Sequence, residues 1–198
     1  VDAGYHVVAP DLRGYNTSSK PADVMQYTLD HMVQDISLLL DEHVLLGKSG
    51  RKILLVGHDW GASVSWIIAQ KYPERVEKLV ACSAPHPSVL FSLKRPMQLL
   101  ASSYFAYLSL KGVAERHFSK NNYSLMLHAL QFVDLADKGI ISKPILLRYI
   151  DAWSKPGALT AMLNYYRALP YYLWNTRNEE TRIKVPTLLI HGTRDQAA

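Results

Sequence analysis

The stretch ILLVGHDWGASVSW, residues 53–66, limits the possible folds more than any other part of the sequence. The four apolar residues at 53–56 are typical of a buried strand, and the apolar residues after Gly61 recur with helical spacing. Between them a short turn holds Asp59, flanked by His58 and Trp60 and by a glycine on either side. A strand that passes so directly into a helix predicts an α/β fold.

Strand and helix patterns alternate along the rest of the sequence. Strands are predicted at residues 7–8, 53–56 and 187–190 and in the segment VEKLVACSAP, residues 76–85, which ends in a proline-rich loop. The helix after the turn is predicted over residues 62–72. Because each predicted strand is nearly all apolar, we expect a mostly parallel sheet that is buried on both faces.

Residues 86–184 have a different pattern, in which strand signals are missing and helical spacing dominates. This region is rich in Tyr, Leu and Met and holds eight of the 12 tyrosines. We interpret it as a helical cap, or lid, inserted into a core made of residues 1–85 and 185–198.

The composition excludes several classes of protein. The apolar content of 48% and the charged content of 20% are ordinary for a globular chain, and no apolar run reaches the roughly 18 residues of a membrane span. A single cysteine, Cys82, excludes an internal disulfide framework. The net charge of +5 is spread along the chain, and no basic run alternates with stacking aromatics, so no nucleic-acid partner is expected.

Asp59 is the candidate nucleophile. In a tight strand–turn–helix corner, close approach of the two backbones is expected to require small residues at Gly57 and Gly61. The central residue is then held in a strained conformation, with the helix N-terminus beneath it favouring a negative charge. A carboxylate there can attack an sp3 carbon and form an ester with its substrate. The alternative is that Asp59 is only the N-cap of the following helix.

Several segments together resemble the epoxide hydrolases of the α/β-hydrolase fold, over essentially the whole sequence. They are APDLRGYNTSSKP, LVGHDWGASVSWIIAQKYPERVEKLV, SAPHP, GVAE, PGALTAMLNYYR and VPTLLIHGTRD. Asn16 departs from the pattern because the family usually has glycine there, but asparagine tolerates a left-handed backbone better than most residues. Haloalkane dehalogenases share the aspartate corner, so the cap segments carry the narrower part of the resemblance.

The resemblance implies roles for particular residues. Asp59 would be the nucleophile, and Tyr104 and Tyr166 would donate hydrogen bonds to the epoxide oxygen, with Tyr107 and Tyr165 as the nearest alternatives. The backbone N–H of Trp60 would form half of an oxyanion hole, while its indole would line the substrate pocket. Asp195 would orient a general-base histidine. No metal and no organic cofactor is implied.

The resemblance also places parts of the site outside this sequence. The base histidine is expected some tens of residues after Asp195, and a His-Gly-x-Pro loop is expected before Val1, with the first strands. We therefore expect an N- and C-terminally incomplete chain that also lacks the last strand and helix and is inactive by itself.

The implied activity is that of an ether-bond hydrolase that converts a small apolar epoxide into a vicinal diol. Haloalkane dehalogenation by the same fold and a non-catalytic truncated homologue stay open as alternatives. Fatty-acid and xenobiotic epoxides both stay open as substrates. So do a cytoplasmic location and association with the endoplasmic-reticulum membrane through a segment before Val1.

Overall fold

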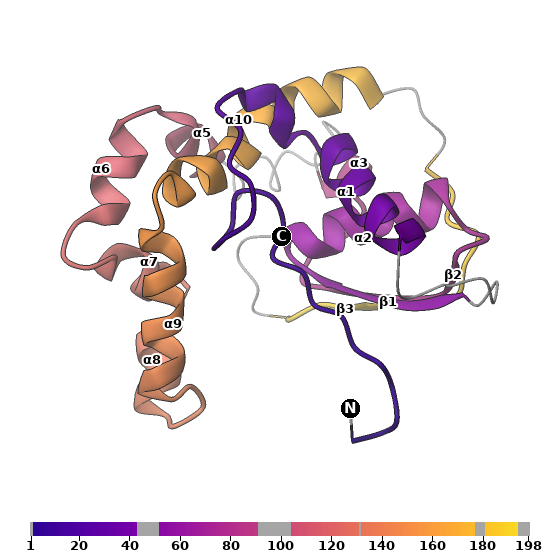
Figure 1. The fold of residues 1–198 in the computed structure, drawn as a ribbon, viewed down its shortest axis with the longest axis horizontal. Helices are drawn as coiled ribbons and strands as arrows, with labels where there is room; N and C mark the ends of the chain where they lie inside the picture. Colours follow the sequence, from indigo (N-terminus) through magenta and orange to yellow (C-terminus); the bar gives the residue numbers. More distant parts are fainter. Residues whose placement is uncertain (1, 43–51, 91–103, 131, 177–180, 194–198) are drawn as a thin grey trace.

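The structure, a computed structural model, describes residues 2–42, 52–90, 104–130, 132–176 and 181–193. Its centre is a parallel sheet of strands β1 (Ile53–His58), β2 (Val76–Cys82) and β3 (Thr187–Ile190), in the order β1-β2-β3. Helices gather on one face of this sheet and extend beyond one end of it (Figure 1). The α/β class and these three predicted strands are confirmed.

The register of the sheet brings the carboxyl ends of its strands together. His58 pairs with Cys82, and Cys82 pairs with Ile190. The backbone continues the ladder for one more residue, because the N–H of Asp59 donates to the carbonyl of Cys82 at 3.2 Å. Asp59 and the residues after Ile190 therefore follow the same edge of the sheet.

Helix α2 (Trp60–Lys71) covers the sheet and explains why this part of the sequence is apolar on all sides. It packs against β1 and β2 on one side and against α1 (Leu29–Glu42) on the other. All of residues 62–69 are buried as a result. The predicted helix over residues 62–72 is confirmed, with a start two residues earlier.

The main core joins α1, α2, the long helix α10 (Ala158–Thr176) and the short helix η1 (Val24–Tyr27). Its buried members are Tyr27, Leu29, Met32, Val33, Val64, Ile67, Ile68, Val76, Ala161, Tyr165, Ala168 and Tyr172. Helix α10 thus contributes to the same core as the helix that follows β1.

The expectation of a sheet buried on both faces is wrong for the described residues. Leu54 and Val56 of β1 are 46% and 68% exposed, and Leu188 and Ile190 of β3 are 55% and 51% exposed. These residues alternate along their strands, so they share the face opposite α2. No element that the structure describes covers that face.

The expected strand at residues 7–8 is also absent. Residues 5–10 have no regular structure, and Tyr5, Val7 and Val8 are exposed. The β-branched residues favour an extended backbone, but a strand also needs a neighbour to complete its hydrogen bonds. None of the described strands pairs with this segment.

Beyond the sheet lie α3 (Pro87–Leu90), α5 (Tyr104–Ser109), α6 (Val113–Ser119), α7 (Ser124–Ala129), α8 (Phe132–Asp137) and α9 (Lys143–Ser154). Helices α5–α9 gather to one side of the sheet, and α10 leads from them back towards α1 (Figure 1). The described part of residues 86–184 contains helices and no strand, as the sequence predicts. The boundaries of a separate cap stay a prediction. None of the helices described here combines the length and the apolar character needed to cross a membrane.

Candidate active site

Asp59 has a backbone that L-residues rarely adopt, with φ of 52° and ψ of −121°. It lies between the last residue of β1 and the first residue of α2, and its side chain makes no capping hydrogen bond to the helix. Its backbone is fixed from both sides, because its N–H donates to Cys82 and its carbonyl accepts from the N–H of Ser63 at 3.0 Å. The predicted strain is therefore confirmed, and the side chain does not serve as an N-cap. Strain of this kind persists where the surrounding structure imposes it, commonly at functional sites.

The glycine before this corner is required by the packing of β1 on α2. A Cβ at Gly57 would lie 2.4 Å from the carbonyl oxygen of Gly61 and 2.5 Å from Oγ of Ser65. A Cβ at Gly61 would meet nothing within 4 Å. The expected close approach exists, but it demands a small residue at Gly57 only, because the missing side chain of Gly61 points into open space.

Trp60 and Tyr166 lie directly beside the corner. The Trp60 ring packs edge-to-face on Tyr166 with the ring centroids 5.3 Å apart. Burial raises the pKa of Tyr166, and the negative charge of Asp59 raises it further, whereas a hydrogen bond with the Trp60 side chain opposes the rise. Tyr166 is therefore a protonated phenol that lies close enough to Asp59 for the carboxylate charge to raise its pKa.

Tyr104 comes to the same place from a different part of the sequence. It lies in α5, is 38% exposed, and has its ring centroid 6.4 Å from that of Tyr166. Phe105 fills the space next to it, with its ring 4.6 Å from Tyr104 and 5.0 Å from Tyr166. The fold thus brings the two tyrosines chosen from the sequence together.

Tyr15 is a residue of this site that the sequence analysis missed. Burial raises its pKa, and Tyr165 and the charge of Asp59 add to the rise. Its ring packs edge-to-face against Tyr165 with the centroids 5.5 Å apart. The available signal was its place in the segment DLRGYN, directly after a glycine with φ of 88° that turns the loop.

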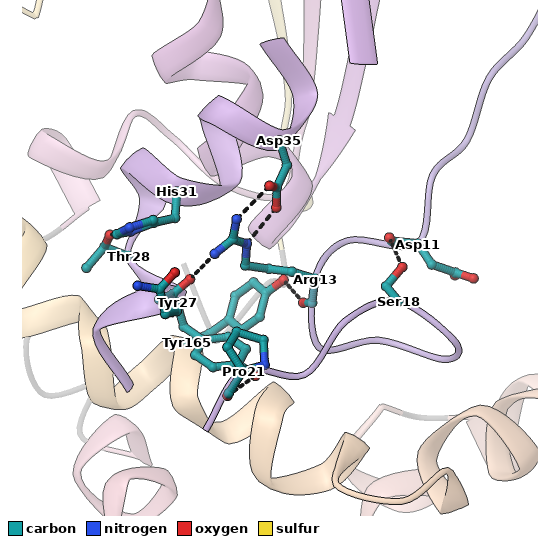
Figure 2. Close-up of polar contacts among 10 residues, drawn as sticks. Asp11, Arg13, Ser18, Pro21, Tyr27, Thr28, His31, Asp35 and Tyr165 are labelled. Carbon is teal, nitrogen blue, oxygen red and sulfur yellow. Dashed lines mark hydrogen bonds and ion pairs between the residues drawn. The ribbon is translucent and has the colours of Figure 1, made fainter. Parts of the chain in front are cut away.

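Contacts with α1 and α10 hold this loop in place (Figure 2). Both Nε and Nη2 of Arg13 donate to the carboxylate of Asp35 at 2.5 Å, and Nη1 donates to the carbonyl of Gln26 at 2.6 Å. The hydroxyl of Tyr165 donates to the Arg13 carbonyl at 2.6 Å. Asn16 has φ of 43°, which confirms that it takes the left-handed backbone expected of it.

The two alternative tyrosines use their hydroxyls elsewhere. Tyr165 is fully buried, and its hydroxyl is bonded to the Arg13 carbonyl. The hydroxyl of Tyr107 is hydrogen-bonded to Nδ1 of His117 on the exposed side of α6. These contacts give each of them a structural role.

His86 also has a structural role. It is 9% exposed, its Nε2 is hydrogen-bonded to Gln70 and its Nδ1 to Ser88, each at 2.8 Å. Burial lowers its pKa to about 4. Its two ring nitrogens are thus both occupied by neighbouring side chains.

Asp195, the expected partner of a base histidine, lies outside the described residues. Strand β3 ends at Ile190, beside Cys82 and at the edge where Asp59 follows β1. Among the residues that the structure describes, no three His, Cys, Asp or Glu side chains gather as a metal site would require.

Comparison with known proteins gives a consistent family. The family model of the alpha/beta hydrolase fold matches residues 1–198. The chain is 42% identical over 172 residues to AB hydrolase superfamily protein YfhM of Bacillus subtilis, a match that covers 85% of this chain and 57% of that protein. It is 37% identical over 200 residues to epoxide hydrolase 4 of Mus musculus, covering 96% of this chain and 52% of the relative.

Solved structures agree with this assignment. An epoxide hydrolase from Bacillus megaterium, crystallised with an inhibitor, superposes with a TM-score of 0.77 at 31% identity, covering 95% of this chain and 66% of the other. The chain spans between half and three fifths of the length of the curated relatives named above. Its sequence, its sheet and its aspartate corner all lead to one assignment: the chain belongs to the α/β-hydrolase fold family.

Proposed function

We propose that the protein hydrolyses epoxides to vicinal diols through a covalent ester on Asp59. The observation that carries this proposal is a carboxylate on a strained corner, with two phenols from different helices beside it. The similarity to mammalian and bacterial epoxide hydrolases supports it. The substrate would be a small apolar epoxide.

In the first step the Asp59 carboxylate attacks one epoxide carbon, and the bond from that carbon to the ring oxygen breaks. The departing oxygen develops the charge of an alkoxide, which is a poor leaving group at neutral pH. Tyr104 and Tyr166 hydrogen-bond this oxygen, and one of them supplies its proton. Because burial and the Asp59 charge raise the pKa of Tyr166, this phenol holds its proton until the oxygen becomes basic.

In the second step water attacks the carbonyl carbon of the Asp59 ester and releases the diol. The backbone N–H of Trp60 donates to the oxyanion that forms. A histidine beyond the residues of this chain, oriented by Asp195, removes a proton from the water and passes it to the diol oxygen that leaves. The proton of the new Asp59 carboxyl group restores the phenol that was deprotonated in the first step. The chemistry uses no metal and no organic cofactor.

A single turnover in heavy-oxygen water tests the ester. The experiment uses the full-length natural protein in excess over a racemic aryl epoxide, followed by mass spectrometry of the diol and of the peptide that carries Asp59. We expect an unlabelled diol and one heavy oxygen in Asp59, since the first diol oxygen comes from the carboxylate. Label that enters the diol directly and never enters Asp59 would show that water attacks the epoxide itself.

Substitution of the tyrosines distinguishes epoxide opening from dehalogenation. Tyr104→Phe and Tyr166→Phe should each slow epoxide opening by about 10²-fold, the typical cost of losing one donor to a developing oxyanion. Tyr107→Phe is the matched control, because its hydroxyl is bonded to His117 and should not affect the rate. A halide leaves without a proton, so steady halide release from a chloroalkane that survives both tyrosine substitutions, with no epoxide turnover, would favour a dehalogenase.

A further inference from the structure

Three consecutive residues of α10 point in different directions, although the rings of Tyr165 and Tyr166 both contact Trp60. Tyr165 points into the main core and bonds the loop at Arg13. Tyr166 packs on Trp60 beside the aspartate corner. Arg167 reaches in a third direction, towards α5 and α6. Successive residues of an α-helix differ by about 100° in direction, so one turn of α10 reaches the loop at Arg13, the aspartate corner, and helices α5 and α6.

All three nitrogens of the Arg167 guanidinium group donate hydrogen bonds. Nε donates to the carbonyl of Ser109 at 3.3 Å, Nη1 donates to Oδ1 of Asn164 at 2.9 Å, and Nη2 donates to Oε1 of Glu115 at 2.8 Å. The side chains of Arg167 and Glu115 are 7% and 18% exposed. These four residues are called the Arg167 network below. Only a planar group with several fixed donors can make all three contacts together.

The carboxylate of Glu115 is fixed by the start of its own helix as well. Its Oε2 accepts from the backbone N–H of Gly112, which precedes α6, at 2.7 Å. Burial alone would raise the pKa of Glu115, but backbone N–H groups and Arg167 outweigh burial and lower it. Glu115 is therefore a charged, fully bonded partner that ties α6 to α10.

The contact with Ser109 matters because Ser109 and Tyr104 belong to the same helix, α5. The described part of helix α5 runs from Tyr104 to Ser109. Helices of a few turns have little stability of their own in water, so the orientation of this helix depends on what it contacts. Its last carbonyls have no partner within the helix, and the guanidinium group of Arg167 satisfies one of them.

We propose that Arg167 and Glu115 are positioning residues that set the placement of Tyr104 relative to Tyr166, an inference that rests on the proposed function. Arg167 follows Tyr166 directly and donates to Ser109, the last residue of the helix that carries Tyr104. The apolar contacts of Leu108 with Ala114 and Leu163 close the same junction. Loss of the network leaves both phenols in the molecule but lets the helix that carries one of them shift.

The test is a double-mutant cycle on the rate of epoxide opening, measured by single turnover in the full-length natural protein. Arg167→Met should slow ring opening by about tenfold to a hundredfold, because a shift of about 1 Å at a reacting group has an effect of that size. Arg167→Lys should recover only part of the loss. Hydrolysis of the Asp59 ester, which does not use the phenols, should change by less than about threefold.

The cycle is completed in the Tyr104→Phe background. If Arg167 acts through Tyr104, Arg167→Met should there slow ring opening by less than about threefold, since the group it positions is already gone. A full tenfold or larger effect in this background would overturn the inference, because Arg167 would then act independently of Tyr104. The matched control is Lys155→Met, which removes an exposed ion pair with Asp151 of similar length, 2.9 Å, and should leave the rate unchanged.

Hydrogen exchange separates failure of the inference from failure of the proposed function. Arg167→Met should speed amide exchange in residues 104–109 and leave residues 143–154 as they were. If the unaltered protein opens no epoxide, the proposed function is wrong, and the catalytic role of the network is overturned with it. If epoxides are opened but exchange in α5 is unchanged by Arg167→Met, only the inference fails.

Discussion

Replacing Gly57 with alanine tests how tightly the aspartate corner is built. The added Cβ would lie 2.4 Å from the carbonyl oxygen of Gly61, whereas unstrained carbon–oxygen contacts begin at about 3.3 Å. Relief therefore requires β1 and α2 to separate by about 0.9 Å, the difference between these two distances. The second overlap, with Oγ of Ser65 at 2.5 Å, can be relieved by rotation of that side chain, but the first involves backbone.

The expected loss of stability is large because the overlap is with a backbone atom, which cannot rotate away as a side chain can. Overpacking of a core commonly costs about 1–3 kcal/mol, and a backbone overlap belongs at or above the upper end, so we expect a loss of about 3–5 kcal/mol. A domain is stable by about 5–15 kcal/mol in total, so the variant should lose at least about a fifth of its stability.

Urea unfolding at about 25 °C, followed by circular dichroism, measures this cost in the full-length natural protein. Gly61→Ala is the matched control, since its Cβ meets nothing within 4 Å. Alanine also favours a helix over glycine by up to about 1 kcal/mol, so this control should be neutral or slightly more stable. If both variants lose less than about 1 kcal/mol, the spacing of β1 and α2 is not set at Gly57 and the reasoning is refuted.

Three other predictions concern the described residues. Burial lowers the pKa of His86 from 6.5 to about 4, so the unfolded chain binds an extra proton between these pH values and stability falls as the pH drops through this window. The loss, about 2 kcal/mol after allowance for solvent screening, should be absent from His86→Gln when unfolding free energies are compared at about pH 7 and pH 4. Asp59→Gly should be about 1 kcal/mol more stable than Asp59→Ala in urea unfolding, because glycine adopts a φ of 52° without strain. At most other positions alanine is the more stable of the two, so equal stabilities would mean that the corner is not strained. Arg13→Lys should cost about 1 kcal/mol because an ammonium group cannot bond both oxygens of Asp35, whereas Lys71→Met, which removes an exposed pair, should cost less than about 0.5 kcal/mol in the same assay.

The local elements were predictable because each has its own pattern in the sequence. Four apolar residues, a glycine and an apolar helix identify β1, the corner and α2 without reference to the rest of the chain. The strain at Asp59 follows from the same pattern, since a strand can turn into a helix within one residue only by leaving the usual backbone regions. The convergence of Tyr104 and Tyr166 came from the resemblance to a family, not from spacing.

The errors have a common physical origin, which is that hydropathy shows which residues favour burial and not what covers them. Val7, Val8 and the outer face of β1 have the composition of buried strands, yet no described element packs on them. Tyr15 was missed because its local sequence does not show which residues it contacts in the fold. It lies on a loop that Arg13 joins to Asp35 of α1, and a contact between residues so far apart in the sequence leaves no local pattern. Asp195 stays a prediction.

The order Tyr165, Tyr166, Arg167 restricts which changes of length this protein can accept during evolution. Inserting or deleting one residue upstream in α10 would rotate all three side chains by about 100°. The core packing of Tyr165, the position of the Tyr166 phenol and the hydrogen bond from Arg167 to α5 would then be lost together. Compensation by point substitution would need three simultaneous changes. Length variation among related chains should therefore fall in the exposed turn between α8 and α9, around Gly139 and Ile140, and be absent between Ala158 and Arg167.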